Sequence, residues 1–277
     1  MALLQINLLS RSLMRTVPVT VVLPVDKMTD FNAPLLPEKK YPTLYLLHGI
    51  FGSTLDWLSG TCIERYATEH DLCVVMPSGD NSFYVDRPGA NQNYGEFVGQ
   101  ELVELTRRML PLSRERKDTF IGGLSMGGFG ALRNGLKYSE TFSAIVALSA
   151  ALETDSMPKR DNSHPVFMQK RSYAEECFGD LNALLTSDKH PKHLADELTA
   201  AGKDVPAIYM ACGESDSLLP HNRDFAAYLE AHNLPVTFEE GPGGHEWPFW
   251  DAYIQKALDW LPIPQVGPGI NSGHVGV

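Results

Sequence analysis

The chain has 277 residues, of which 43% are hydrophobic and 21% are charged. This composition is typical of a folded globular protein and excludes the disordered, collagen-like and coiled-coil classes. The formal charge of −11 disfavours a nucleic acid or an anionic membrane surface as partner, because both would repel the chain.

The cysteine spacing and the N-terminal residues indicate in which cell compartment the protein is expected to work. Four cysteines lie far apart and form no CxxC pair or zinc-binding cluster: Cys62, Cys73, Cys177 and Cys212. Neither a disulfide framework nor a metal site is indicated, and reduced thiols favour a cytoplasmic location. The first residues lack the basic start, apolar core and cleavage site of a signal peptide. No stretch approaches the roughly 18 to 20 apolar residues that would cross a bilayer.

Apolar and β-branched runs predict a series of strands. They lie at residues 16–23, 43–47, 72–76, 119–124, 144–148, 207–211 and 236–239. Helical stretches alternate with them, at residues 62–69, 97–110, 128–137, 221–232 and 249–260. Such alternation predicts βα units wound into one mostly parallel sheet with helices on both faces.

Two segments depart from this alternation. Residues 150–203 form a polar stretch with three X-Pro pairs, which we interpret as an insertion or cap-like segment with short helices within a single domain, residues 1–262. Residues 263–277 are rich in glycine and proline and have no apolar period. They predict a flexible C-terminal tail.

The strongest local signal is an apolar strand that runs into G-x-S-x-G and then into a helix. This pattern is typical of a nucleophile elbow, in which Ser125 sits in a strained turn with its hydroxyl exposed. Gly123 and Gly127 flank the serine, where a tight turn leaves no room for side chains. The alternative is an ordinary glycine-rich turn at the end of a strand.

A serine nucleophile needs a histidine to remove its proton and a carboxylate to orient that histidine, in the chain order Ser, Asp or Glu, His. His245 is the candidate base because it follows a Gly-Pro-Gly-Gly loop between a strand and the last helix. Asp216, in the turn after the 207–211 strand, is preferred over Glu214 as the acid. The alternatives are a surface loop residue for His245 and a helix cap or solvated turn for either carboxylate.

Acyl transfer also needs N–H donors for an oxyanion. We expect the first from the backbone of Met126 and the second from Ile50, in the loop after the 43–47 strand, with Phe51 as the fallback donor. His48 is interpreted as a structural histidine whose ring bonds neighbouring backbone. Four further histidines lie on polar segments and are expected to be solvated: His190, His193, His221 and His232.

Five sequence blocks resemble the esterase D branch of the α/β-hydrolases. In family order they are HGIFGSTLDW (48–57), MPSGDNSFYVD (76–86), GGLSMGGFGAL (122–132), CGESD (212–216) and GGHEWPFW (243–250). The resemblance implies an α/β-hydrolase fold, with a mostly parallel central sheet, helices on both faces and a helical insertion after the sixth strand. It also implies Ser125, Asp216 and His245 as a catalytic triad that uses no metal or other cofactor.

Within this branch the chain is most similar to small tributyrin or acetyl esterases. We therefore expect a serine carboxylesterase that hydrolyses short-chain acyl esters through an acyl-enzyme intermediate. The expected partner is a small-molecule or glycan-linked ester, and the loop at residues 80–84 is expected to border its acyl or alcohol pocket. Four aromatic residues are candidate walls of its binding site, with core packing as the alternative for Trp57 and Tyr84: Phe51, Trp57, Tyr84 and Trp247.

Other functions stay open on the sequence. A carbohydrate esterase would remove acetyl or feruloyl groups from plant polysaccharide, and an S-formylglutathione hydrolase would need a basic or polar site, for which Arg87 is the nearby candidate. A non-catalytic binding module would show a broken triad, which the sequence does not. A homo-oligomer is compatible with the sequence, which identifies no interface.

Overall fold

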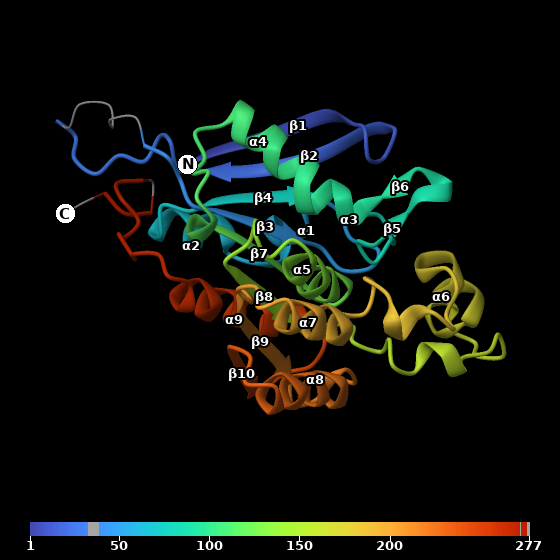
Figure 1. Cartoon of the computed structure of the whole chain (residues 1–277). Helices are drawn as coiled ribbons and strands as arrows, with labels where there is room; N and C mark the ends of the chain where they lie inside the picture. Colours follow the sequence, from blue (N-terminus) through green and yellow to red (C-terminus); the bar gives the residue numbers. More distant parts are fainter. Residues whose placement is uncertain (33–38, 272, 276–277) are drawn as a thin grey trace.

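The computed structural model describes residues 1–32, 39–271 and 273–275. Within these residues an eight-stranded sheet forms the centre of the molecule (Figure 1), in the order β1-β2-β4-β3-β7-β8-β9-β10. β2 pairs antiparallel with both β1 and β4, and all other neighbours are parallel. The strands are β1 (Ala2–Ser10), β2 (Arg15–Leu23), β3 (Thr43–Leu47), β4 (Cys73–Pro77), β7 (Thr119–Leu124), β8 (Ala144–Leu148), β9 (Ala207–Gly213) and β10 (Val236–Gly241).

Helices connect these strands, and a small hairpin of β5 (Asp86–Arg87) and β6 (Gln92–Asn93) lies outside the main sheet. One π-helical turn, Phe97–Glu101, precedes α4. The α-helices are α1 (Asp56–Gly60), α2 (Ile63–Glu69), α3 (Tyr94–Glu96), α4 (Leu102–Met109), α5 (Met126–Lys137), α6 (Arg171–Phe178), α7 (Pro191–Ala200), α8 (Leu219–Ala231) and α9 (Trp247–Trp260).

The sheet separates two hydrophobic cores, because successive side chains of a strand point to opposite faces. In β3, Leu44 and Leu46 belong to the core under α1, α2 and α9, whereas Tyr45 and Leu47 belong to the core under α4, α5, α7 and α8. Every residue of β3 is buried, as expected for a strand covered on both faces.

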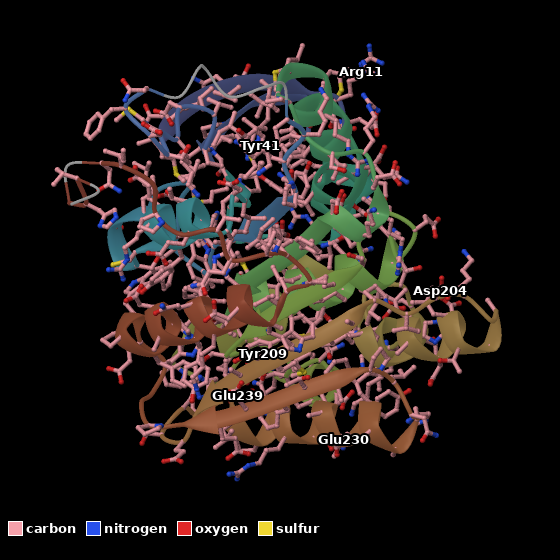
Figure 2. All side chains as sticks on the ribbon, turned by 90° about the vertical axis from the view of Figure 1, so that its left-hand side faces the viewer. Arg11, Tyr41, Asp204, Tyr209, Glu230 and Glu239 are labelled. Carbon is pink, nitrogen blue, oxygen red and sulfur yellow. The ribbon has the colours of Figure 1, made fainter. Side chains whose placement is uncertain are left out.

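The last strand, β10, lies at one edge of the sheet. Figure 2 shows Tyr209 on β9 inside the molecule and Glu239 on the edge strand β10, and the Tyr209 hydroxyl donates a hydrogen bond to Glu239 (3.0 Å). Charged side chains on an edge strand discourage pairing with another sheet.

The predicted fold class is confirmed. Each of the seven strands expected from apolar runs is present, and the insertion follows β8, the sixth strand of the main sheet in chain order. The sequence analysis missed β1, which pairs with β2 over nine residues. It also began the central helix two residues late, since α5 starts at Met126.

Part of the segment predicted to be a flexible tail contacts the rest of the molecule. Ile263 packs against the core under α2 and α9, and the N–H groups of Val266 and Gly267 both donate to the carbonyl of Glu69 (2.7 and 3.1 Å). That carbonyl belongs to the last residue of α2 and has no helical partner of its own, so the tail satisfies it. Residues 272, 276 and 277 of the tail, and residues 33–38, lie outside the described residues.

The insertion lies at one side of the molecule, with α6 beside the β5–β6 hairpin (Figure 1). Arg133, on α5, contacts both the insertion and the β5–β6 hairpin, and its side chain is completely buried. Its Nε donates to the carbonyl of Asp188 in the insertion (2.8 Å), and its Nη2 lies 2.7 Å from the Asp188 carboxylate and 3.3 Å from that of Asp86. Burial alone would raise the pKa of both carboxyls, but the cations of Arg133 and Lys137 outweigh it and lower both pKa values below 3.8.

We predict that Arg133→Met lowers the free energy of unfolding by about 2 to 4 kcal/mol, because it leaves two partly buried carboxylates with Lys137 as their remaining cation. Urea denaturation at neutral pH measures this loss. Lys137→Met is the matched control; its side chain is partly exposed, and we expect it to cost about 1 kcal/mol or less.

The same loss should shrink as the pH falls below about 4. The lowered pKa values of Asp86 and Asp188 mean that their ion pairs stabilise the fold above the ordinary carboxyl pKa and stop doing so once both are protonated. An Arg133→Met penalty that is independent of pH would contradict this account.

Candidate active site

The serine of the G-x-S-x-G motif lies at the corner between β7 and α5. Ser125 has φ 53° and ψ −118°, a conformation that non-glycine residues rarely adopt. The flanking glycines are required by close backbone contacts. A Cβ atom at Gly123 would lie 2.4 Å from the carbonyl oxygen of Gly127, and one at Gly127 would lie 2.4 Å from the carbonyl oxygen of Leu47. The sequence thus forms the predicted elbow.

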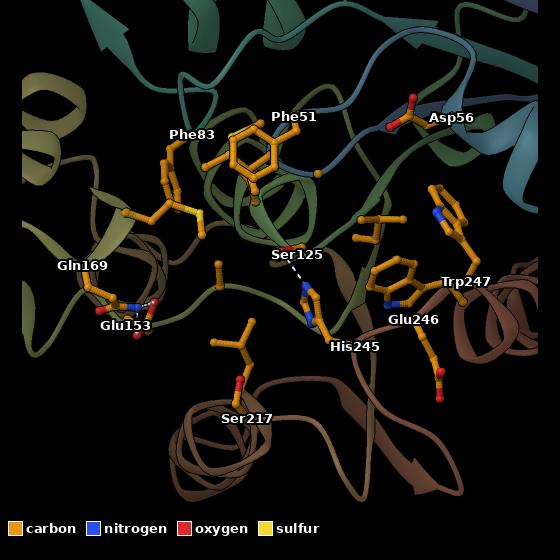
Figure 3. A pocket seen from close by; sticks show the side chains of 18 of the residues that line it. Phe51, Asp56, Phe83, Ser125, Glu153, Gln169, Ser217, His245, Glu246 and Trp247 are labelled. Atoms are coloured by element: carbon orange, nitrogen blue, oxygen red, sulfur yellow. Dashed lines mark hydrogen bonds between the residues drawn. The ribbon is translucent and has the colours of Figure 1, made fainter. Parts of the chain in front are cut away.

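His245 and Asp216 reach this serine from the loops after β10 and β9. The Nε2 of His245 lies 2.9 Å from Ser125 Oγ, and its Nδ1 lies 2.9 Å from Asp216 Oδ2 (Figure 3 shows the serine–histidine contact). The structure therefore brings together the three residues chosen from the sequence. Glu214, the competing carboxylate, is exposed and makes no such contact.

Backbone hydrogen bonds join the two loops. The N–H of Ser215 donates to the carbonyl of Gly243 (2.9 Å), and the N–H of Glu214 donates to the carbonyl of Gly241 (2.9 Å). The ring of Trp250 meets that of His245 edge-on at 4.9 Å. These contacts hold the imidazole in place while leaving it about a third exposed to substrate.

Asp216 is buried, and its carboxylate is held in its charged form. Burial alone would raise its pKa, but hydrogen bonds from His245 and from the N–H of Leu218 outweigh this effect, so the pKa lies below its ordinary value of 3.8. A charged Asp216 accepts the Nδ1 proton of His245. The Nε2 atom is then the free acceptor that faces Ser125.

Ile50 and Met126, the predicted oxyanion donors, both line the cavity beside the serine. Among the described residues, neither the N–H of Ile50 nor that of Met126 donates to a protein acceptor. The N–H of Phe51, by contrast, donates to Asn81 Oδ1 (2.9 Å). The fallback donor is therefore already occupied, which leaves Ile50 and Met126 as the pair available to an oxyanion.

The interpretation of His48 as a structural residue is confirmed. Its Nε2 accepts a hydrogen bond from the N–H of Gly79 (2.9 Å), so its Nδ1 carries the proton and donates to the carbonyl of Gly49 (2.7 Å). Burial lowers its pKa and favours the neutral ring. His190, expected to be solvated, is instead buried and bonded to Asp155 (2.7 Å).

A cavity of about 890 Å³ opens beside Ser125 and His245. Phe51 and Trp247 line it, as expected from the sequence. Phe51 is 70% exposed and meets Phe167 of the insertion at 5.9 Å between ring centroids. These aromatic groups place an apolar rim around the reacting atoms.

Trp57 and Tyr84 do not line this cavity, which corrects their assignment as substrate-binding residues. The indole of Trp57 is buried under the sheet and donates to the carbonyl of Leu47 (3.1 Å). The hydroxyl of Tyr84 is buried and donates to the carbonyl of His48 (3.0 Å). Both are held inward by backbone carbonyls at and just after the end of β3.

The loop at residues 80–84, expected to border the substrate pocket, reaches the cavity through Phe83 and not through its neighbour Tyr84. Asn81 of the same loop holds the backbone of Phe51. Other lining residues were not singled out from the sequence. Some of these come from the insertion, where no sequence signal marked them: Glu153, Arg160, Met168 and Gln169.

Two kinds of feature, a metal-binding cluster and a membrane-spanning helix, are absent from the described residues. No group of three or more His, Cys, Asp or Glu side chains in residues 1–32, 39–271 and 273–275 is placed to hold a metal ion. No helix in this part of the chain is long and apolar enough to span a membrane.

A mostly parallel sheet with a serine at its central strand–helix corner, bonded to a histidine and through it to an aspartate, defines a serine hydrolase of the α/β-hydrolase type. Comparison with known proteins agrees. The model of the Esterase family, described as "Putative esterase", matches residues 10–261. The chain therefore belongs to this family, and it is a serine hydrolase that acts on carboxylic ester bonds.

Individual relatives cover almost the whole chain. An acetyl esterase of Caldicellulosiruptor saccharolyticus is 42% identical over 261 residues, 94% of this chain and 98% of the relative. Two solved structures from Staphylococcus aureus are each 32% identical and cover 94% of this chain and 98% of their own. They are the substrate-bound fluorophosphonate-binding serine hydrolase F, with a TM-score of 0.82, and an S-formylglutathione hydrolase, with a TM-score of 0.80.

We predict that Asn81→Ala lowers kcat on the order of 10-fold with little change in KM, because it frees the backbone next to Ile50 and loosens one oxyanion donor. Outright loss of such a donor typically costs about 100- to 1000-fold. Steady-state kinetics with 4-nitrophenyl acetate measure the effect. Asn182→Ala, in an exposed turn of the insertion, is the control. A raised KM with unchanged kcat would mean that Asn81 shapes binding alone.

Proposed function

We propose that the chain hydrolyses short-chain acyl esters, acetyl esters foremost, with Ser125 as nucleophile, His245 as general base and Asp216 as the group that orients it. The observation that carries this proposal is the unbroken hydrogen-bond series from Asp216 through His245 to Ser125, with both distances 2.9 Å. A serine held in this way loses its proton to the imidazole as it attacks.

In the first half of the proposed reaction, His245 Nε2 takes the proton of Ser125 as Oγ bonds to the ester carbonyl carbon. The N–H groups of Ile50 and Met126 stabilise the resulting oxyanion. When the tetrahedral intermediate collapses, the bond to the alcohol oxygen breaks, and that oxygen leaves with the proton from His245. Ser125 then carries the acyl group.

In the second half, water replaces the alcohol. His245 takes a proton from the water as it attacks the acyl carbon, and returns this proton to Ser125 Oγ when the acid leaves. Throughout, Asp216 stays charged and stabilises the imidazolium that forms twice per cycle. The proton transfers use His245 and Ser125, whose Nε2 and Oγ atoms lie 2.9 Å apart.

Short acyl groups are favoured by the polar ends of the cavity. Asp56 and Glu246 line it on the side of Trp247, and Glu153 and Gln169 line it on the side of Phe83 (Figure 3). A long alkyl chain extended in either direction would desolvate a carboxylate, which is costly. The 42%-identical acetyl esterase supports the same preference.

The cavity is less suited to a glutathione thioester. Arg87, the basic residue proposed from the sequence, does not line it and is bonded to Glu176 of α6 (2.6 Å). Arg160 is the arginine among the described lining residues, and it is paired with Glu153 (3.3 Å). Carboxylates of a peptide would therefore meet no free cation there. This favours an oxygen ester as substrate.

We also propose that the protein works in the cytoplasm. The support is the cysteine pattern: three of the four thiols are buried inside the domain, and all four are free. Cell fractionation, followed by fluorophosphonate labelling of each fraction, tests this location.

We predict that Ser125→Ala abolishes hydrolysis of 4-nitrophenyl acetate and labelling by a fluorophosphonate probe, because both need an activated serine. Circular dichroism should remain that of the wild type, since only a hydroxyl is removed. Turnover retained above about one thousandth of the wild-type rate would remove Ser125 from the proposed role.

A second prediction concerns acyl length. Across 4-nitrophenyl esters from acetate to decanoate, we expect kcat/KM to be highest between acetate and butyrate and at least about 10-fold lower for decanoate, because the longer chain must lie against a carboxylate. Steady-state rates below the critical micelle concentration measure this series. A rise in kcat/KM up to decanoate would contradict the proposed short-chain preference.

A further inference from the structure

The insertion contributes a polar group to an otherwise mostly apolar cavity. Glu153 follows the end of β8 by a few residues, and Gln169 ends a short 3₁₀ turn, Phe167–Gln169. Figure 3 shows the two side chains together, across the cavity from Asp56 and Trp247, with Ser125 and His245 between these ends. The Gln169 amide donates to the Glu153 carboxylate, at 3.1 Å from one oxygen and 3.4 Å from the other.

Arg160 pairs with the same carboxylate. Its side chain is nine-tenths buried, its Nη2 lies 3.3 Å from Glu153 Oε1, and its Nη1 donates to the carbonyl of Met168 (3.1 Å). The Nη2 atom is buried and has no hydrogen-bond partner of good geometry. The guanidinium therefore offsets the charge of Glu153 without using up its acceptor capacity.

The Glu153 carboxylate consequently has acceptor positions to spare. A carboxylate can accept about four hydrogen bonds. Among the described residues, Gln169 and Arg160 are its side-chain partners, and its side chain remains about a fifth exposed on the cavity wall. A fixed acceptor whose charge is already offset suits a neutral hydroxyl donor better than a cation.

We propose that Glu153 accepts hydrogen bonds from hydroxyl groups on the alcohol part of the ester, so that the preferred substrates are acetyl esters of a polyhydroxylated alcohol such as a sugar. This inference rests on the proposed function and names its substrate class. The cavity volume of about 890 Å³ supports it, because an acetyl group fills only a small part of a space that suits a ligand of many atoms.

The test compares two acetyl esters with the same skeleton. In 6-O-acetylglucose and cyclohexylmethyl acetate the acetyl group is attached through one methylene to a six-membered ring, and only the first carries hydroxyls. We expect Glu153→Leu to lower kcat/KM for 6-O-acetylglucose by about 10- to 100-fold, as expected when a buried hydroxyl loses its acceptor. For cyclohexylmethyl acetate we expect a change of less than about twofold.

Two further variants control for folding and for charge. Glu153→Gln keeps one acceptor oxygen and nearly the same shape, so it should retain an intermediate preference for the sugar ester. Glu197→Gln removes one negative charge from an exposed site on α7 of the same insertion. It should leave both rates unchanged.

The outcomes separate the two proposals. Equal losses on both esters in Glu153→Leu and Glu153→Gln would show that Glu153 only supports the insertion, and no loss on either would show that it contacts no substrate; both overturn the inference. A parallel pair, methyl 4-hydroxycinnamate and methyl cinnamate, tests the acyl side. An effect confined to that pair overturns the assignment to the alcohol. If Ser125→Ala retains activity, the proposed function itself fails, whatever Glu153 does.

Discussion

The site depends on the backbone of one strained residue. Ser125 has a positive φ, and three main-chain hydrogen bonds hold it there. Its N–H donates to Leu148 at the end of β8 (2.9 Å), and its carbonyl accepts from Phe129 in α5 (3.0 Å) and from Ala151 (3.0 Å) at the start of the insertion. A strained backbone conformation of this kind persists only where several surrounding contacts hold it in place. Here the strand, the helix and the insertion each contribute one bond.

The sheet then determines where the partners of this serine lie. β7, β8, β9 and β10 are parallel neighbours, so the loops that follow them emerge at the same edge. Asp216 and His245 occupy two such loops, joined by the bonds between Ser215 and Gly243 and between Glu214 and Gly241. Residues 120 positions apart in sequence therefore meet without any local pattern that connects them.

Sequence reasoning succeeded where the constraint was local. The elbow requires glycine beside the serine, and buried strands require continuous apolar runs, so both were visible in the chain. β1 was missed although most of its residues are apolar. On this edge strand Leu3 and Leu9 are exposed, so the apolar residues lie on both faces and give no clear alternation. The contacts between the tail and α2 could not be predicted, because they are main-chain hydrogen bonds, which leave no trace in composition.

The cavity wall was harder to predict than the reacting groups. Phe83 and Tyr84 are adjacent and both have positive φ, so one lines the cavity while the other points into the core. No periodicity distinguishes them. Glu153 and Gln169 are brought together by a 3₁₀ turn and a buried arginine, and neither feature follows a regular hydrophobic pattern.

One helix links the reacting groups with this wall. α5 carries Met126, a candidate oxyanion donor, at its first position, and Arg133 two turns later. Arg133 binds Asp188 of the insertion, while Ala151 at the other end of the insertion bonds to Ser125 itself. A buried ion pair removed on one side alone is strongly destabilising, so the insertion is held to the same rigid element as the nucleophile. Substrate choice can therefore change through the cavity-lining side chains of the insertion, while the main-chain bond from Ala151 and the geometry around Ser125 stay the same.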